Sequence, residues 1–179
     1  MKHFAQFILK YLWRWQFEGH FHKDLNKFVI IVAPHTSWVD FPLGVLVKWA
    51  QGIDTNFIGK NTLFKPPFGF IFRALGGTPV DRSQNTNLVN AIVAEFNKRE
   101  RFSLALSPEG TRKKVEQWKT GFYYIAQGAQ VPIIMLSLNY PHRLLKISEP
   151  YYLTDDKEAD FKHFHQYFQG VKGFHADLS

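Results

Sequence analysis

Short apolar runs alternate with helical patterns along most of this chain, and that alternation restricts the folds it can form. An α/β fold is predicted: a single domain in which helices flank a mixed, mostly parallel central sheet. With 179 residues the chain can bury one core. The predicted strands cover 28–33, 55–58, 102–106, 132–138 and, as a possible edge strand, 144–147, and the predicted helices cover 41–50, 89–99, 117–127 and 156–169.

A histidine and a carboxylate follow the first predicted strand. His35 and Asp40 lie directly before the next helical pattern begins. Imidazole accepts a hydroxyl proton near neutral pH, and a carboxylate on its other nitrogen fixes the tautomer and stabilises the imidazolium that forms. The pair therefore fits a general base with its orienting carboxylate, although the spacing alone also fits a strand-end loop with a helix cap.

Two further runs carry polar residues suited to a site. The run 109–112 comes soon after a predicted strand, and ligands of α/β sheets gather at the carboxyl ends of strands, so the fold can bring this run close to His35. The run 76–82 has two glycines that would let the backbone approach a ligand, and Arg82 could clamp a phosphate. Each run alone also fits a surface turn or a surface ion pair.

Charge and aromatic content together favour a membrane interface. The net charge of +7 indicates an anionic partner, and the aromatic content of 17% exceeds what a small core needs. No stretch approaches the roughly 20 apolar residues that span a bilayer, so the chain is not expected to cross a membrane. Cysteine is absent, which excludes disulfides, thiolate zinc sites and a cysteine nucleophile.

The N-terminal residues have an amphipathic aromatic pattern. Residues 1–25 are predicted to be a membrane-interface helix, best defined over 1–18, and 26–179 to be the folded domain. A helix packed against the core fits the pattern as well, and both interpretations stay open. The apolar positions recur at helical spacing: Phe4, Ile8, Tyr11, Leu12 and Trp15.

A second aromatic stretch covers residues 63–75. The Pro66–Pro67 pair interrupts it, which favours a broken helix or an apolar loop. The stretch is a candidate for contacting the bilayer or guiding an acyl chain, and a core corner is the alternative.

Taken in order, the polar runs resemble the glycerolipid acyltransferase family, which is typified by 1-acylglycerol-3-phosphate acyltransferases. The resemblance covers roughly residues 28–140. The chain departs from the family pattern at Pro34, Lys113, 79–81 and Met135. The matching segments are 35–40 (H-x-x-x-x-D), 77–82 (the arginine-bearing second motif), 109–112 (E-G-T-R) and 131–133 (the proline motif).

The resemblance implies transfer of a fatty acyl group from acyl-CoA or acyl carrier protein to the hydroxyl of a lysophospholipid, first of all 1-acylglycerol-3-phosphate, in phospholipid biosynthesis. His35 would take the proton of the acceptor hydroxyl while Asp40 orients the imidazole, so that no enzyme nucleophile is required. Backbone amides near Gly110 or beside Pro132 would stabilise the oxyanion. No cofactor and no metal ion are implied.

The resemblance also implies that the remaining motif residues bind substrate. Arg82 and Arg112 would bind the phosphate of the acceptor, and Thr111 would add a hydroxyl donor. Gly110 would let the backbone approach closely. Because a carboxylate does not bind phosphate favourably, Glu109 would position an arginine or receive a glycerol hydroxyl.

The implied partners are the acyl donor, the lysophospholipid and a membrane surface, without nucleic acid. The implied location is cytoplasmic, peripheral at the inner face of the cell membrane. One alternative keeps the chemistry but changes the acceptor, for example to an aminolipid. Another is a non-catalytic basic protein that binds membrane or nucleic acid, which would need cations but no general base.

Overall fold

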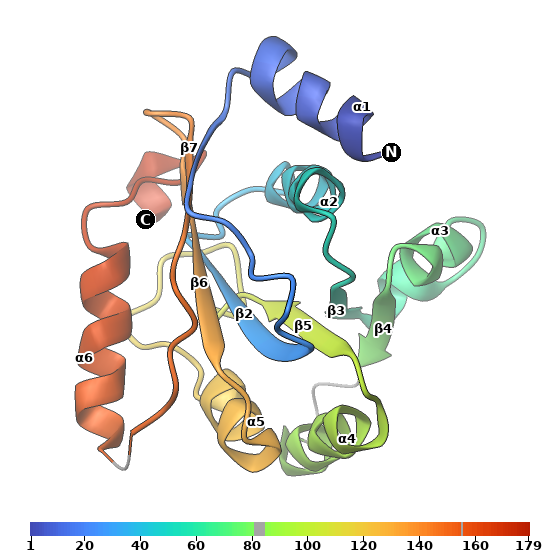
Figure 1. Ribbon diagram of the computed structural model, residues 1–179, viewed down its shortest axis with the longest axis vertical. Helices are drawn as coiled ribbons and strands as arrows, with labels where there is room; N and C mark the ends of the chain where they lie inside the picture. The colour runs from blue at the N-terminus through green and yellow to red at the C-terminus, as the bar shows by residue number, and fades with distance from the viewer. Residues whose placement is uncertain (81–84, 155) are drawn as a thin grey trace.

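The computed structural model describes residues 1–80, 85–154 and 156–179. Within these ranges seven strands form one sheet in the order β1-β7-β6-β2-β5-β3-β4 (Figure 1). The strands are β1 (Gln16–Glu18), β2 (Lys27–Ala33), β3 (Asn56–Lys60), β4 (Gly77–Val80), β5 (Phe102–Leu106), β6 (Ile133–Asn139) and β7 (Leu144–Ile147). The helices and helical turns are α1 (Lys2–Phe7), η1 (Ile8–Leu12), α2 (Asp40–Gln51), η2 (Asn61–Phe64), α3 (Gly69–Ala74), α4 (Asn85–Lys98), α5 (Gly121–Ala129), α6 (Lys157–Phe168) and η3 (Ala176–Leu178).

The sheet is mostly parallel, as predicted. β6 pairs antiparallel with β7, whereas β2 pairs parallel with both β5 and β6 and therefore lies at the centre of the sheet. β7 was expected at the edge, but β1 pairs with its outer side. β1 escapes prediction because it is only three residues long and its apolar content is low.

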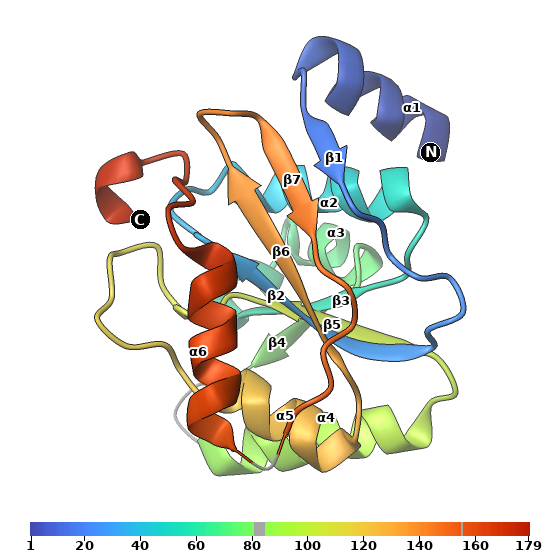
Figure 2. The same cartoon turned by 60° about the vertical axis from the view of Figure 1, so that its left-hand side comes forward.

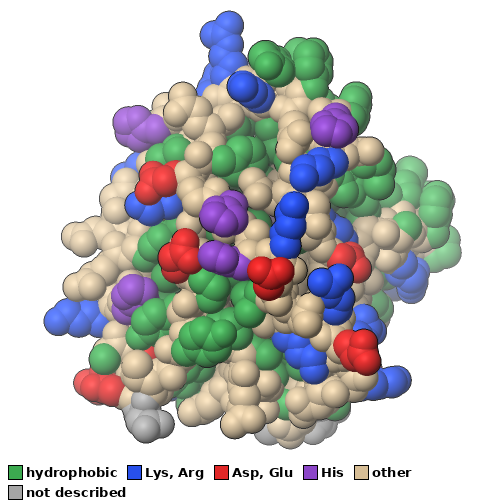
Figure 3. Space-filling view, in the orientation of Figure 1, with side chains coloured by type: hydrophobic (Ala, Val, Ile, Leu, Met, Phe, Trp, Pro, Cys, Tyr) green, Lys and Arg blue, Asp and Glu red, His purple; other side chains and the backbone are tan. Residues whose placement is uncertain are grey.

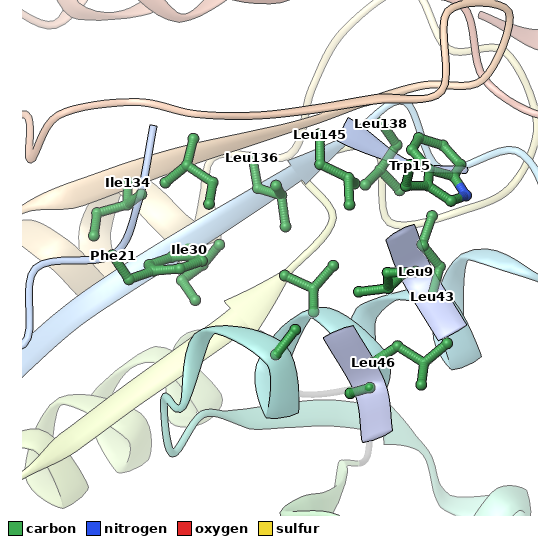
Figure 4. Packing of buried hydrophobic residues seen from close by; sticks show 14 of the residues in the cluster. Leu9, Trp15, Phe21, Ile30, Leu43, Leu46, Ile134, Leu136, Leu138 and Leu145 are labelled. Carbon is green, nitrogen blue, oxygen red and sulfur yellow. The ribbon is translucent and has the colours of Figure 1, made fainter. Parts of the chain in front are cut away.

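Helices cover both faces of the sheet (Figures 1 and 2). Alternate side chains of β2 point to opposite faces, so Ile30 packs with α1 and α2, and Ile31 packs with α4, α5 and α6. Figure 4 shows the first of these clusters, where Leu9 and Leu43 meet the strand residues. Burial on both faces explains why the central strands are continuous apolar runs.

The N-terminal helical segment is shorter than predicted. It ends at Leu12, and residues 16–18 join the sheet, so the predicted helix over 1–25, with its best-defined part over 1–18, is wrong beyond residue 12. Ala5 and Leu9 are fully buried against α2, and Trp15 belongs to the core instead of the exposed stripe. The opposite side is exposed and apolar, with Phe4 at 63%, Phe7 at 51%, Tyr11 at 61% and Leu12 at 63%.

The second aromatic stretch is a broken helix, formed by η2 and α3 with a turn at 65–68. Phe64 is buried, whereas Leu63, Phe68, Phe70 and Ile71 are exposed.

The glycine of β4 has a packing role that the sequence did not indicate. A Cβ at Gly77 would lie 2.6 Å from the Phe57 ring and 2.8 Å from the Phe64 ring. A ligand was predicted to lie close to the backbone of this segment. At Gly77, aromatic side chains of the protein occupy that space instead.

Candidate active site

The loop that carries His35 lies at the carboxyl end of the central strand. Pro34 has no N–H to continue the β2 ladder, and α2 begins at Asp40. β5 and β6 flank β2 in parallel, so their carboxyl ends reach the same edge of the sheet. The loops that follow these strands therefore converge on His35.

His35 and Asp40 form the predicted pair. His35 Nδ1 lies 2.9 Å from Asp40 Oδ2, and the two side chains are 30% and 3% exposed. The same carboxylate oxygen accepts hydrogen bonds from the backbone N–H of Thr36 at 3.0 Å and of Ser37 at 2.9 Å. Asp40 thus orders the loop as well as the imidazole. Because Nδ1 faces Asp40, the nitrogen suited to accept a proton from a ligand is Nε2.

Glu109 contacts the backbone of the same loop. Its Oε2 accepts a hydrogen bond of 2.9 Å from the His35 N–H. Burial raises the pKa of Glu109 above 4.5. This hydrogen bond and the charge of the nearby His35 offset part of the increase, and the charge of Asp40 raises the pKa further. The family resemblance implied an arginine or a glycerol hydroxyl as the partner of Glu109. The structure instead shows Glu109 holding the backbone of His35.

The rest of the 109–112 run lies in the long loop between β5 and α5. Gly110 has a φ of +64°, and Lys119 packs against it. The Thr111 hydroxyl accepts a hydrogen bond of 3.4 Å from the Lys113 N–H, and Arg112 is exposed. α5 begins at residue 121, four residues later than predicted, and within the loop before it the Lys119 N–H donates to the Pro108 carbonyl at 2.8 Å.

Two predicted positions need separate comment. Arg82 lies outside the described residues. The proline motif lies at the far end of the sheet from His35, since Ile133 pairs with Val29 at the start of β2 and Ser137 pairs with Ala33 at its end. Four residues of strand span about 13 Å, so amides beside Pro132 do not reach the His35 loop and the oxyanion role predicted for them is wrong.

Tyr140 is a site residue that the sequence motifs do not include. Its hydroxyl donates a hydrogen bond of 2.6 Å to Asp40 Oδ1, the oxygen that does not face His35. Burial is the largest cause that raises the pKa of Tyr140 well above its usual range, and the hydrogen bond to Asp40 and the negative charge of Asp40 raise it further. The hydroxyl therefore stays protonated. A signal was present, because Tyr140 directly follows an apolar strand, the same location that drew attention to His35.

Two cavities border these residues. One of 170 Å³ has Pro34, Glu109, Trp118, His165 and Phe168 among its lining residues. The other, of 360 Å³, is lined by Leu12, Trp13, Trp15, Val39, Leu43, Tyr140 and Arg143. The second cavity therefore extends from the exposed N-terminal segment to the tyrosine that contacts Asp40.

Neither a metal cluster nor a membrane span is found in the part of the chain that the structure describes. No group of three or more His, Asp or Glu side chains there is arranged to hold a metal ion. None of the described helices is long and apolar enough to cross a bilayer.

The arrangement supplies the elements of general base catalysis: a partly exposed imidazole, a buried carboxylate on its inner nitrogen, and a loop held by hydrogen bonds. An exposed loop with Arg112, Lys113 and Lys114 adjoins it. Such a site can activate a hydroxyl on a ligand that carries negative charge.

Comparison with known proteins identifies the fold and the family. The chain is similar in fold to the crystal structure of the 1-acyl-sn-glycerophosphate (LPA) acyltransferase PlsC from Thermotoga maritima, with 24% sequence identity and a TM-score of 0.67 over 93% of this chain and 74% of that one. A search of curated proteins gives no match. The family model named Acyltransferase matches residues 14–139, which include the His35–Asp40 pair and the Glu109 loop. The chain therefore belongs to the acyltransferase family.

Proposed function

We propose that the protein transfers a fatty acyl group from acyl-CoA or acyl carrier protein to the hydroxyl of a lysophospholipid, with 1-acylglycerol-3-phosphate as the acceptor. The observation that carries this proposal is the contact between His35 Nδ1 and buried Asp40 Oδ2 at 2.9 Å. It leaves Nε2 to remove the proton of the acceptor hydroxyl as that oxygen attacks the thioester carbonyl. The new ester bond forms as the carbon–sulfur bond breaks, and the thiol leaves with a proton.

The acceptor phosphate is assigned to the loop that follows β5. Arg112 offers a planar fork for phosphate oxygens, and Lys113 and Lys114 add charge beside it. Arg82 is proposed as a second cation, and Thr111 as a hydroxyl donor. Glu109 is proposed to act through the backbone of His35, because its Oε2 accepts the hydrogen bond from the His35 N–H. Gly110 keeps the backbone of this loop close to the substrate.

We assign the apolar part of the substrate to the side of the molecule that carries exposed aromatic residues. Hydrophobic side chains gather over α1 and over α3 on the face shown in Figure 3. Trp38, between His35 and Asp40 in the loop, is 70% exposed. Exposed apolar groups near a polar site fit an enzyme that works at a bilayer surface. We propose the inner face of the cell membrane as that surface.

The function is tested by comparing two histidine variants. Purified parent protein, His35→Ala and His22→Ala are incubated with a labelled acyl thioester and a panel of lysolipids. His22 also contacts a carboxylate, Glu149, at 2.7 Å, but on the surface and away from the proposed chemistry, so it is a matched control. We expect His35→Ala to lose transfer by at least about 100-fold and His22→Ala to retain it. Full activity of His35→Ala, or no acylated product from the parent with any donor and acceptor, would refute the proposal.

The acceptor class is decided in the same experiment. Lysophosphatidic acid, a lysophospholipid with an amine headgroup and a neutral monoacylglycerol are compared at equal concentration. Preference for the phosphate monoester supports the proposed acceptor. Preference for the amine headgroup supports the alternative in which an aminolipid is acylated.

Membrane contact is tested with substitutions at exposed positions, because deletion of residues 1–18 would remove the buried Leu9 and Trp15 together with β1. The paired variants Phe4→Ser with Phe7→Ser and Phe68→Ser with Phe70→Ser are sedimented with anionic vesicles. Each lost ring reduces affinity about tenfold if most of its area enters the bilayer. A control, Tyr152→Ser, removes a ring that is 62% exposed elsewhere. Unchanged binding of both pairs would refute this membrane surface.

A further inference from the structure

Tyr140 makes a contact with the pair that no motif of the chain accounts for. It directly follows β6 and lies 100 positions from Asp40 in sequence, yet its hydroxyl donates to Asp40 Oδ1 at 2.6 Å. Oδ2 is occupied by His35 Nδ1 and by the backbone N–H groups of the loop. The two oxygens of the carboxylate are therefore held by different parts of the chain. The loop between β2 and α2 holds Oδ2, and the residue that follows β6 holds Oδ1.

The tyrosine ring is itself fixed by both ends of the chain. Trp15, just before β1, packs edge to face against it with ring centroids 5.0 Å apart, and Phe174 does the same from the C-terminal segment at 5.4 Å. The Tyr140 N–H also donates to the Lys172 carbonyl at 2.9 Å. A hydroxyl on a ring held in this way is a preorganised donor. The same C-terminal segment also contacts the His35 loop, since the His175 N–H donates to Thr36 Oγ1 at 3.1 Å.

We propose that Tyr140 is a positioning residue of the acyl transfer reaction, which acts by holding Asp40 in the orientation that orders the His35 imidazole. The inference rests on the proposed function. A carboxylate held at one oxygen can still rotate about its Cβ–Cγ bond, which swings the other oxygen off the imidazole N–H. With Oδ1 held by Tyr140, this rotation breaks a charge-assisted hydrogen bond, so Oδ2 stays directed at Nδ1.

The orientation of Asp40 also determines how strongly the carboxylate stabilises the protonated form of the His35 imidazole. The groups that face this carboxylate are His35 and the loop amides from its own side, Tyr140 from β6, and the charge of Glu109 from the loop after β5. Removal of the tyrosine hydroxyl lets Asp40 Oδ2 turn away from Nδ1, so the carboxylate stabilises the protonated imidazole less. The acid limb of the kcat profile should therefore move to lower pH.

The test is Tyr140→Phe, which keeps the ring between Trp15 and Phe174 and removes only the hydroxyl. The matched control is Tyr151→Phe, because the Tyr151 hydroxyl donates at 2.7 Å to Asp160, a buried carboxylate of the separate network beside α6. We expect Tyr140→Phe to lower kcat about tenfold, with KM within about twofold, and to shift the acid limb. Tyr151→Phe should lower thermal stability but leave kcat and the pH profile unchanged.

A double variant and a spectrum separate positioning from a general effect on folding. In the Asp40→Asn background, Tyr140→Phe should cost less than about twofold, because the residue acts through Asp40. In the NMR spectrum of otherwise unchanged protein, the His35 Nδ1 proton should move upfield in Tyr140→Phe, because its hydrogen bond to the released Asp40 weakens, and stay in place in Tyr151→Phe. This spectrum needs no substrate, so it tests the contact even if the parent acylates none of the lysolipids and the proposed function fails. A Tyr140→Phe variant with parental kcat and an unmoved acid limb, or with an unmoved proton, would overturn the inference.

Discussion

Replacement of Asp40 by asparagine isolates the charge of the carboxylate from its shape. The side chain is 3% exposed, and Asn occupies nearly the same volume. If the amide oxygen takes the place of Oδ2, it can still accept from the backbone N–H of Thr36 and Ser37, so the loop has its hydrogen-bond acceptor. The Tyr140 hydroxyl can then turn to accept from the amide NH₂. The main loss is the negative charge beside His35.

The magnitude follows from the geometry. Two unit charges about 4 Å apart attract by about 4 kcal/mol at an effective dielectric constant near 20. This attraction is gained as His35 becomes protonated, so its loss raises the barrier by a similar amount and lowers kcat about 1,000-fold. That value lies inside the range of about 100 to 10,000-fold for positioned general bases. The stability cost should be only about 1–2 kcal/mol, because most hydrogen bonds can re-form.

The assay follows release of the donor thiol with a thiol-reactive dye, because the chain has no cysteine to contribute background. Asp160→Asn is the matched control, since Asp160 is fully buried and accepts hydrogen bonds from Tyr123 and Tyr151. It should lose stability and keep its kcat. The reasoning is refuted if Asp40→Asn retains more than about a tenth of parental kcat, or if Asp160→Asn loses as much activity as Asp40→Asn.

Three further outcomes are expected. Burial raises the pKa of Glu109, so the folded state binds its proton more tightly than the unfolded state, and stability falls as pH rises through the range just above 4.5. The stability of Glu109→Gln should not fall in this way. In thermal melts, the melting temperature of the variant should therefore rise relative to that of the parent across this pH range, and a difference in melting temperature that does not change with pH contradicts the assignment. Arg112→Ala should raise KM about tenfold for lysophosphatidic acid and barely change it for a neutral monoacylglycerol, and equal effects on both acceptors would exclude a phosphate contact. Leu9→Ala empties a fully buried site under α2 and should cost about 2–5 kcal/mol in denaturant unfolding, whereas a cost below about 1 kcal/mol would show that η1 is not part of the core.

Prediction from sequence succeeded where a pattern is local and strongly apolar. β5 and β7 have the predicted bounds, and β2, β6, α2 and α6 lie within two residues of theirs. The two missed strands are short and lie at the edges of the sheet. β4 contains Gly77 and Pro79 and directly follows Gly76, which is a turn pattern that an edge strand tolerates. Backbone pairing with a neighbouring strand, and not side-chain pattern, forms these two elements.

The sequence by itself determined the α/β class, the His35–Asp40 pair and the family, because five-residue spacing and motif order are properties of a continuous chain. Only the tertiary structure decided which distant groups complete the site. Strand register brings Tyr140 to Asp40 across 100 positions and Glu109 to the His35 backbone across 74, and it places Pro132 at the opposite end of the sheet. Register depends on how two separate strands pair, and a shift of two residues would leave every buried side chain on its own face while moving these contacts by about 7 Å.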